Sequence, residues 1–150
     1  MARGIYSVHG DAQTIATAIT ILEITAPATA ILQIRRVWVG QSSATTDALA
    51  RIRILRKTAT ITGTASPPTA IPLGAAAASG CTVKWVATGE GTDSTVIIEE
   101  AFHIKSGFLW QPANDREQII VPPSGIIALK FPAAPTSASY TFGFIYEEMG

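Results

Sequence analysis

Apolar and polar side chains alternate with a period of two along much of this chain, and this alternation restricts the fold more than any other feature. Over residues 48–57, for example, Ala50, Ile52 and Ile54 share one parity while Arg51 and Arg53 share the other. This period is typical of half-buried strands, and the abundance of Ile, Val and Thr favours the same structure. No segment shows a sustained helical period, so the sequence predicts an all-β protein with less than about 10% helix.

Turn-forming residues divide the 150-residue chain into eight to ten short strands. We expect strands at residues 15–25, 30–40, 48–57 (with a continuation to 64), 81–86, 96–104, 108–111, 118–121, 126–131 and 139–147. Many short strands in one domain predict an antiparallel β-sandwich or barrel, and a jelly roll of about eight strands fits this length best. Residues 65–80 carry three prolines and predict a long loop, with at most one short helical turn in the alanine run 75–78.

Two details of the strands predict which side chains face the core. Leu32, Ile34 and Trp38 share one parity, and the Arg35-Arg36 pair between them indicates a β-bulge that returns Val37 or Trp38 to the core face. Near the end of the chain, four aromatic side chains share one face: Tyr140, Phe142, Phe144 and Tyr146. Residues 15–150 are therefore expected to form a single sandwich domain, whereas residues 1–14 lack a strong period and are expected to form a flexible N-terminal arm.

The composition is apolar and poor in charge: 47% of residues are hydrophobic, 15% are charged, and the formal net charge is zero. A monomer with such a surface would be poorly soluble, so we expect a homo-oligomer, most simply a trimer. The aliphatic content excludes a disordered chain. No apolar run reaches the length of a membrane helix, and the N-terminus shows no apolar signal segment. With zero net charge, nucleic acid is not an expected partner.

Charge is unevenly distributed along the chain. Residues 1–75 carry seven basic and three acidic side chains, a net of +4, whereas residues 76–150 carry four basic and eight acidic ones, a net of −4. Two interpretations are open: a solvated strand face, or an interface with an acidic patch of a neighbouring chain, in which complementary charges set the register. The candidate interface residues are Arg35, Arg36, Arg51 and Arg53, the acidic pair Glu147 and Glu148, and the aromatic Trp110.

Residues capable of catalysis or metal binding are few and scattered. His9 and His103 are the only histidines and are not grouped with carboxylates as a metal site requires, and Cys81, the only cysteine, lies on the expected core face. The adjacent pair Glu99-Glu100 points to opposite faces of a strand, which excludes a local acid–base dyad. Glu90 and Asp93 flank a Gly-rich turn without the pattern of a calcium loop. We therefore expect no enzyme, no cofactor and no metal.

Several segments together resemble the small jelly-roll decoration, or cement, proteins of tailed bacteriophage heads. The segments that carry the resemblance are residues 23–27 leading into 31–39, Phe108-Leu109-Trp110-Gln111-Pro112, residues 119–126, and the ending 142–150. The resemblance implies a β-sandwich subunit, usually trimeric, that binds the outer surface of the capsid and clamps neighbouring coat proteins. It implies no catalytic residues, and it places the protein on the exterior of the virion.

Two other functions remain open from the sequence. A receptor- or carbohydrate-binding module of a virion would need an exposed aromatic cluster, for which Trp110 and the Tyr140/Tyr146 parity are candidates; Trp38 and Trp85 are expected in the core. A cupin-like enzyme would need clustered histidines, which the sequence lacks.

Overall fold

The computed structural model describes residues 2–72 and 77–150, and this part of the chain contains strands but no helix. The strands are β1 (Ala2–Ile15), β2 (Ile19–Thr25), β3 (Ile31–Gln41), β4 (Leu49–Ala59), β5 (Thr62–Ala65), β6 (Thr69–Ala70), β7 (Thr82–Gly89), β8 (Thr92–His103), β9 (Phe108–Trp110), β10 (Ile119–Val121), β11 (Ile126–Phe131) and β12 (Ala138–Met149). The expected all-β class is confirmed. Eight of these strands are long, and β5, β6, β9 and β10 are additional pairings of two to four residues.

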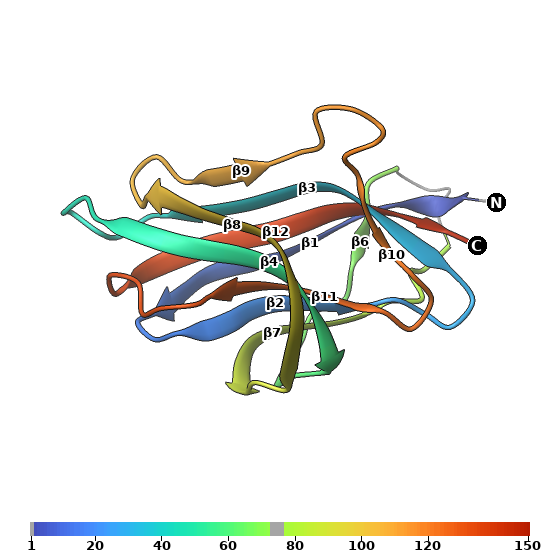
Figure 1. Cartoon of the computed structure of the whole chain (residues 1–150), viewed down its shortest axis with the longest axis horizontal. Helices are drawn as coiled ribbons and strands as arrows, with labels where there is room; N and C mark the ends of the chain where they lie inside the picture. The colour runs from blue at the N-terminus through green and yellow to red at the C-terminus, as the bar shows by residue number, and fades with distance from the viewer. Residues whose placement is uncertain (1, 73–76) are drawn as a thin grey trace.

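The strands form two antiparallel sheets that pack face to face as a β-sandwich (Figure 1). Sheet A has the order β10-β3-β12-β1-β6, with β9 also paired to β3, and sheet B has the order β5-β7-β2-β11-β4-β8. The two chain ends lie at the same end of the sandwich, because β1 and β12 are antiparallel neighbours with Ala2 opposite Met149 (Figure 1). One flank of the sandwich therefore carries the edge strand β8 of sheet B beside the edge strands β9 and β10 of sheet A.

The core between the sheets is aromatic on the side of β12, as the sequence predicts. Tyr140, Phe142, Phe144 and Tyr146 each have 0% of their surface exposed, because alternate residues of a strand point to one face. Tyr6 of β1 stacks on Tyr146 with ring centroids 5.7 Å apart. Burying such rings removes a large apolar area from water, which is the main favourable contribution to the stability of the sandwich.

The expected bulge in the second predicted strand is present at Arg35. Arg36 lies opposite Ile145 while Ile34 lies opposite Tyr146, so Arg35 is the extra residue of β3. The bulge returns Val37, not Trp38, to the core. Trp38 is half-buried on the outer face of sheet A, where its ring occupies the space that a side chain at Gly143 would fill. The expectation that Trp38 shares the core face with Leu32 and Ile34 is therefore wrong.

The expected N-terminal arm, residues 1–14, is a strand and not a flexible tether. Apart from Met1, which lies outside the described residues, this segment belongs to β1 and pairs with β12 along its length. Tyr6 and Val8 are buried in the core. The strand is not evident from the sequence, because only these two large apolar residues alternate before the pattern is interrupted. The interruption is a bulge between Gly10 and Gln13, where Ala12 has a φ of 37°.

Two further boundaries differ from the prediction. The single strand expected at residues 15–25 is two strands, because the chain leaves sheet A at Ile15 and enters sheet B at Ile19 through an exposed connection. The expected loop 65–80 contains the two-residue strand β6, which pairs with Tyr6 and Ser7 of β1. Of the alanine run 75–78, the first two residues lie outside the described residues, and Ala77 and Ala78 are not helical.

Candidate functional site

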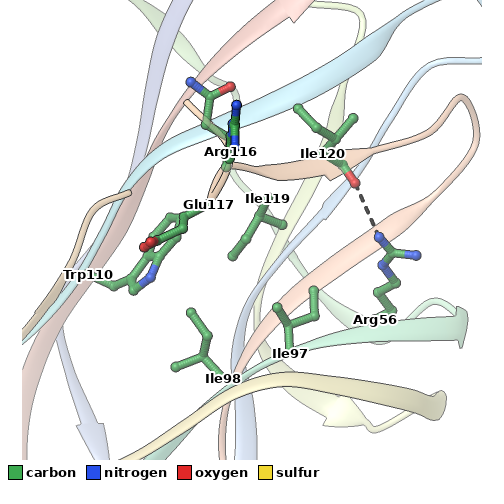
Figure 2. Close-up of a pocket in the computed structure, with 9 residues that line it drawn as sticks. Arg56, Ile97, Ile98, Trp110, Arg116, Glu117, Ile119 and Ile120 are labelled. Atoms are coloured by element: carbon green, nitrogen blue, oxygen red, sulfur yellow. Dashed lines mark hydrogen bonds between the residues drawn. The ribbon is translucent and has the colours of Figure 1, made fainter. Parts of the chain in front are cut away.

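An apolar groove runs along the flank of the sandwich where the edges of the two sheets meet. It has a volume of about 370 Å³. Its lining, which we call the edge groove, consists of Arg56, Ile97, Ile98, Trp110, Arg116, Glu117, Gln118, Ile119 and Ile120. Figure 2 shows Ile97, Ile98 and Ile119 between the ring of Trp110 at one end and Arg56 at the other. The groove exists because neither β8 nor β10 is followed by a further strand in its sheet.

A bulge in β8 places two consecutive isoleucines in the edge groove. Ile98 lies opposite Ile54 of β4 and Val96 lies opposite Leu55, so Ile97 is an extra residue without a partner on β4. Consecutive residues of a regular strand point to opposite faces, but a bulge suspends that rule locally. Both side chains are consequently half-buried in the groove, and Val96 is 41% exposed.

The other wall comes from β9, β10 and the turn between them. Trp110 lies opposite Val37 of β3, and Ile119 lies opposite Ile34 of the same strand. Pro112 follows shortly after Trp110 and lacks the N–H that would continue the pairing of β9. Pairing to β3 of sheet A therefore holds the aromatic and aliphatic side of the groove.

Hydrogen bonds within the turn fix the polar residues of this wall. Asn114 donates to Glu117 from its side-chain amide at 2.9 Å and accepts from the Arg116 N–H at 2.9 Å. Gln118 donates to the carboxylate of Asp115 at 3.0 Å. Figure 2 shows the Glu117 side chain directed toward the ring of Trp110. This end of the groove therefore carries both a carboxylate and an aromatic ring.

Two arginines of the edge groove have no acidic partner in the described part of the chain. The guanidinium of Arg56 on β4 reaches across to sheet A and donates only to the carbonyl oxygen of Ile120, at a long 3.4 Å (Figure 2). Arg116 forms no ion pair with any described residue. Both side chains are exposed. They are available to an anionic group of a binding partner.

Exposed apolar side chains are found on the strands that form the edge groove. Among the described residues, six large hydrophobic side chains are exposed, and four of them lie on β4, β8, β9 and β10: Leu49, Val96, Leu109 and Ile120. Leu49 is 68% exposed and Leu109 is 59% exposed. Free sheet edges with apolar side chains are typical of surfaces that bind other chains. We call these four residues the edge flank.

The interface residues expected from the sequence lie in different environments in the structure. Arg51 and Arg53 of β4 both bind Glu99 of the neighbouring β8, at 3.1 Å and 2.7 Å, and Arg35 binds Glu147 across β3 and β12. These ion pairs lie within one chain, which does not prevent the same side chains from meeting a partner. Arg36 is exposed on the outer face of sheet A.

Of the expected interface residues, Glu148 is buried within the chain and Trp110 lies in the edge groove. Glu148 has 0% of its surface exposed, so its prediction as a surface charge is wrong. Its carboxylate accepts hydrogen bonds from the Ser79 hydroxyl at 2.8 Å and from the Gly80 N–H at 3.0 Å. Strand parity could have shown this, because Glu148 shares the inward parity of Tyr146. Trp110 is half-buried in the edge groove, the only one of the seven expected residues that lines it.

Cys81 lies beside this buried carboxylate and has the properties of a structural thiol. Burial raises the pKa of the Cys81 thiol to about 11, since desolvation disfavours the thiolate and the nearby Glu148 opposes it further. The thiol donates to Glu148 at 3.5 Å. Burial also raises the pKa of Tyr146, which shares a hydrogen bond of 2.9 Å with Ser79. A nucleophilic cysteine needs the opposite setting, one that stabilises its thiolate.

Glu90 and Asp93, at the turn between β7 and β8, bind lysines of the same chain. Lys57, whose side chain is 0% exposed, contacts Asp93 at 2.5 Å and donates to the Glu90 carbonyl oxygen at 2.7 Å. Lys130 binds Asp93 at 2.6 Å and Glu90 at 3.2 Å. Burial alone would raise the pKa of both carboxyl groups, but hydrogen bonds from Thr20 to Glu90 and from the two lysines to Asp93 lower it below the usual range. The network fastens the β7–β8 turn to strands β4 and β11.

The remaining candidates do not assemble into a site. His103 contacts Asp47 at 2.9 Å on an exposed surface. In residues 2–72 and 77–150 no three His, Cys, Asp or Glu side chains are grouped so that they could hold a metal ion. Trp85 is partly buried against Phe142 at 6.4 Å between ring centroids. No helix in the described residues is long and apolar enough to span a membrane.

Comparisons with models of protein families, with characterised proteins and with solved structures found no match. Sequence reasoning located Trp110 but missed Ile97, Ile98, Arg56, Glu117 and Ile120. The signal that could have indicated the groove is the run Val96-Ile97-Ile98, in which three consecutive β-branched residues interrupt the alternation of β8.

Proposed function

We propose that this protein is a structural decoration, or cement, protein of a tailed bacteriophage head, which binds the outer surface of the capsid and stabilises it. The observation that carries the proposal is the edge flank: two free sheet edges meet at one groove, Ile120 is exposed at that groove, and the other three exposed apolar side chains lie on the adjoining strands β4, β8 and β9. Such a flank supports an association function, since apolar edge strands are costly unless another chain covers them. The segmental resemblance to cement proteins supplies the kind of partner.

In this proposal the protein assembles as a homotrimer and contacts the major capsid protein on the exterior of the virion. A partner that binds the intact shell and not free coat subunits stabilises the shell by mass action, by about 2.7 kcal/mol per site at a concentration of one hundred Kd. Repetition of the contact over the lattice multiplies the effect, and an oligomer adds multivalency. The function requires no cofactor, metal, nucleic acid or membrane, and no catalytic residue.

The proposal is tested by heating undecorated capsids with and without the protein. Wild-type protein should bind the shells and raise the temperature at which they disrupt. The Ile120→Glu variant, which places a charge at the rim of the edge groove, should lose most of this effect. The Ile71→Glu variant is the matched control, because Ile71 is also exposed but lies away from the edge groove. If wild-type protein neither binds shells nor shifts their disruption temperature, the cement function is rejected.

A second candidate, a receptor- or carbohydrate-binding module of a virion, is favoured by Trp110 alone. Its half-buried ring lies in the groove with the side chains of Glu117 and Gln118, and an aromatic face beside hydrogen-bonding groups is suited to a sugar ring. Titration with a panel of oligosaccharides, followed by tryptophan fluorescence, tests this function. A saturable change that Trp110→Phe weakens and Trp110→Ala removes would favour it over the cement function.

A further inference from the structure

The edge groove has the dimensions and the charge arrangement of a site for one extended segment of a partner protein. Its centre is apolar: the side chains of Ile97, Ile98 and Ile119 line it, and the free edge of β8 runs alongside. An extended segment presents side chains to such a groove at every second residue and offers backbone groups to an unpaired strand edge. A volume of about 370 Å³ accommodates a few side chains and not a folded domain.

Three charged residues line the edge groove: Arg56, Arg116 and Glu117. Figure 2 shows the Arg116 side chain directed away from Trp110, and the other two carry opposite charges at the two ends of the groove. Arg56 lies at one end, and its only hydrogen bond within the described residues is the long contact with the Ile120 carbonyl. Glu117 lies at the other end, with its side chain directed toward Trp110 (Figure 2). A cation there would meet both a carboxylate and the face of an indole ring, two contacts that favour positive charge.

The charged group at the Trp110 end is held in place before any partner binds. Asn114 donates to the Glu117 carboxylate at 2.9 Å, and the backbone N–H of Glu117 donates to the Asn114 carbonyl at 3.2 Å. A side chain fixed in this way loses little conformational freedom on binding, which favours recognition of charge at a defined position.

From these features we infer that the edge groove binds an extended partner segment with aliphatic side chains at its centre, a carboxylate at the Arg56 end and a Lys or Arg side chain at the Trp110 end. This inference deepens the proposed function and rests on it, because the segment is the contact through which the protein would hold a coat subunit. A second copy of β8 does not meet the requirement. Its charged side chains are Asp93, Glu99, Glu100 and His103, so it brings carboxylates but no Lys or Arg to the Trp110 end.

The test uses three capped peptides of about nine residues, long enough to span such a groove as a strand. All three alternate isoleucine and threonine; the first carries aspartate near one end and lysine near the other, the second carries two aspartates, and the third carries two lysines. Binding is measured by tryptophan fluorescence and calorimetry at low and high salt. The wild-type protein should bind the aspartate–lysine peptide at least about threefold more tightly than either of the other two, the effect expected for one exposed ion pair.

Charge substitutions in the protein should change this ranking in a defined way. The Glu117→Lys variant should prefer the peptide with two aspartates, and the Arg56→Glu variant should prefer the peptide with two lysines. Arg36→Glu is the matched control, since Arg36 is an exposed arginine outside the groove, and it should keep the wild-type ranking. Circular dichroism and thermal unfolding establish that each variant is folded.

The outcomes separate this inference from the proposed function. Equal affinity for all three peptides, a ranking that the substitutions leave unchanged, or no binding by folded wild-type protein would overturn the inference, even if the protein still decorated capsids by another surface. Binding with the expected ranking, together with failure to bind capsids, would support the segment-binding groove and reject the cement function.

Discussion

Lys57 shows how a single buried charge can organise a surface turn. Its side chain is fully buried, and its ammonium group contacts Asp93 at 2.5 Å and the Glu90 carbonyl at 2.7 Å. Removing a charge from water is costly unless hydrogen bonds and an opposite charge replace the solvent. Asp93 provides an opposite charge and also binds Lys130, and Glu90 lies 3.7 Å from Lys57 and 3.2 Å from Lys130, so two carboxylates compensate two lysines.

This network predicts acid sensitivity at the scale of one residue. Because the pKa values of Asp93 and Glu90 are lower in the folded protein than their ordinary values of 3.8 and 4.5, their contribution to stability is complete above those values and is lost as the pH falls through the folded values. The free energy of unfolding of the wild type should therefore fall below about pH 4.5. Asp93→Asn should lose about 1–2 kcal/mol at pH 7 and show a weaker dependence on pH.

Urea denaturation between pH 3 and pH 7 measures this effect. Asp115→Asn is the control, because Asp115 is an exposed carboxylate whose hydrogen-bond partner is Gln118 and not a lysine. Identical pH dependence in the wild type and Asp93→Asn would show that the network does not contribute to stability.

Among the strands, β1 is the one whose structural role is least evident from its sequence. It lies inside sheet A, paired with β12 on one side along its length and with β6 on the other at Tyr6 and Ser7. Its inward side chains, Tyr6 and Val8, are each 1% exposed. A strand in this position supplies both backbone hydrogen bonds and core volume, so it belongs to the folded domain.

Removal of β1 should therefore prevent folding, whereas a flexible arm would be dispensable. A chain without residues 2–11 should give no cooperative unfolding transition. Val8→Ala should lower the free energy of unfolding by about 2 kcal/mol, because it leaves a cavity in the core. Ser7→Ala, at the neighbouring position on the opposite face, should change it by less than about 0.5 kcal/mol. Urea denaturation of the three proteins checks this, and equal stabilities of wild type and Val8→Ala would contradict it.

At the scale of the whole molecule, the edge flank is the surface through which we expect the sandwich to contact other chains. Leu49 and Leu109 are the two most exposed large hydrophobic side chains of the described residues, and neither lines the edge groove. Exposed apolar surface of this kind is favourably covered by a symmetry-related copy. In our proposal the edge groove binds a different partner.

Light scattering should give a mass three times that of the 15.8 kDa chain. The double substitution Leu49→Glu and Leu109→Glu should shift the protein to a monomer that still unfolds cooperatively, since both side chains are exposed in the monomer. Ile71→Glu should leave the mass unchanged. A wild-type mass of 15.8 kDa at micromolar concentration would contradict the trimer.

The sequence by itself determined the elements whose side chains alternate over many residues. The aromatic face of β12, the alternation of Ala50, Ile52 and Ile54 in β4, and the bulge at Arg35 are all local patterns, because strand parity follows from the geometry of a single strand. For the same reason the all-β class and most strand positions could be predicted without knowledge of the partner strands.

Only the tertiary structure decided which strands meet and which charges remain free. The pairing of β1 with β12 joins residues from opposite ends of the chain, and the edge groove joins β4, β8, β9 and β10 from different sheets. Strand parity already gives the inward direction of Glu148, but its hydrogen-bond partners, Ser79 and Gly80, are brought to it only by the tertiary structure. Such contacts depend on distances between residues far apart in the chain, and the period of a strand carries no information about them.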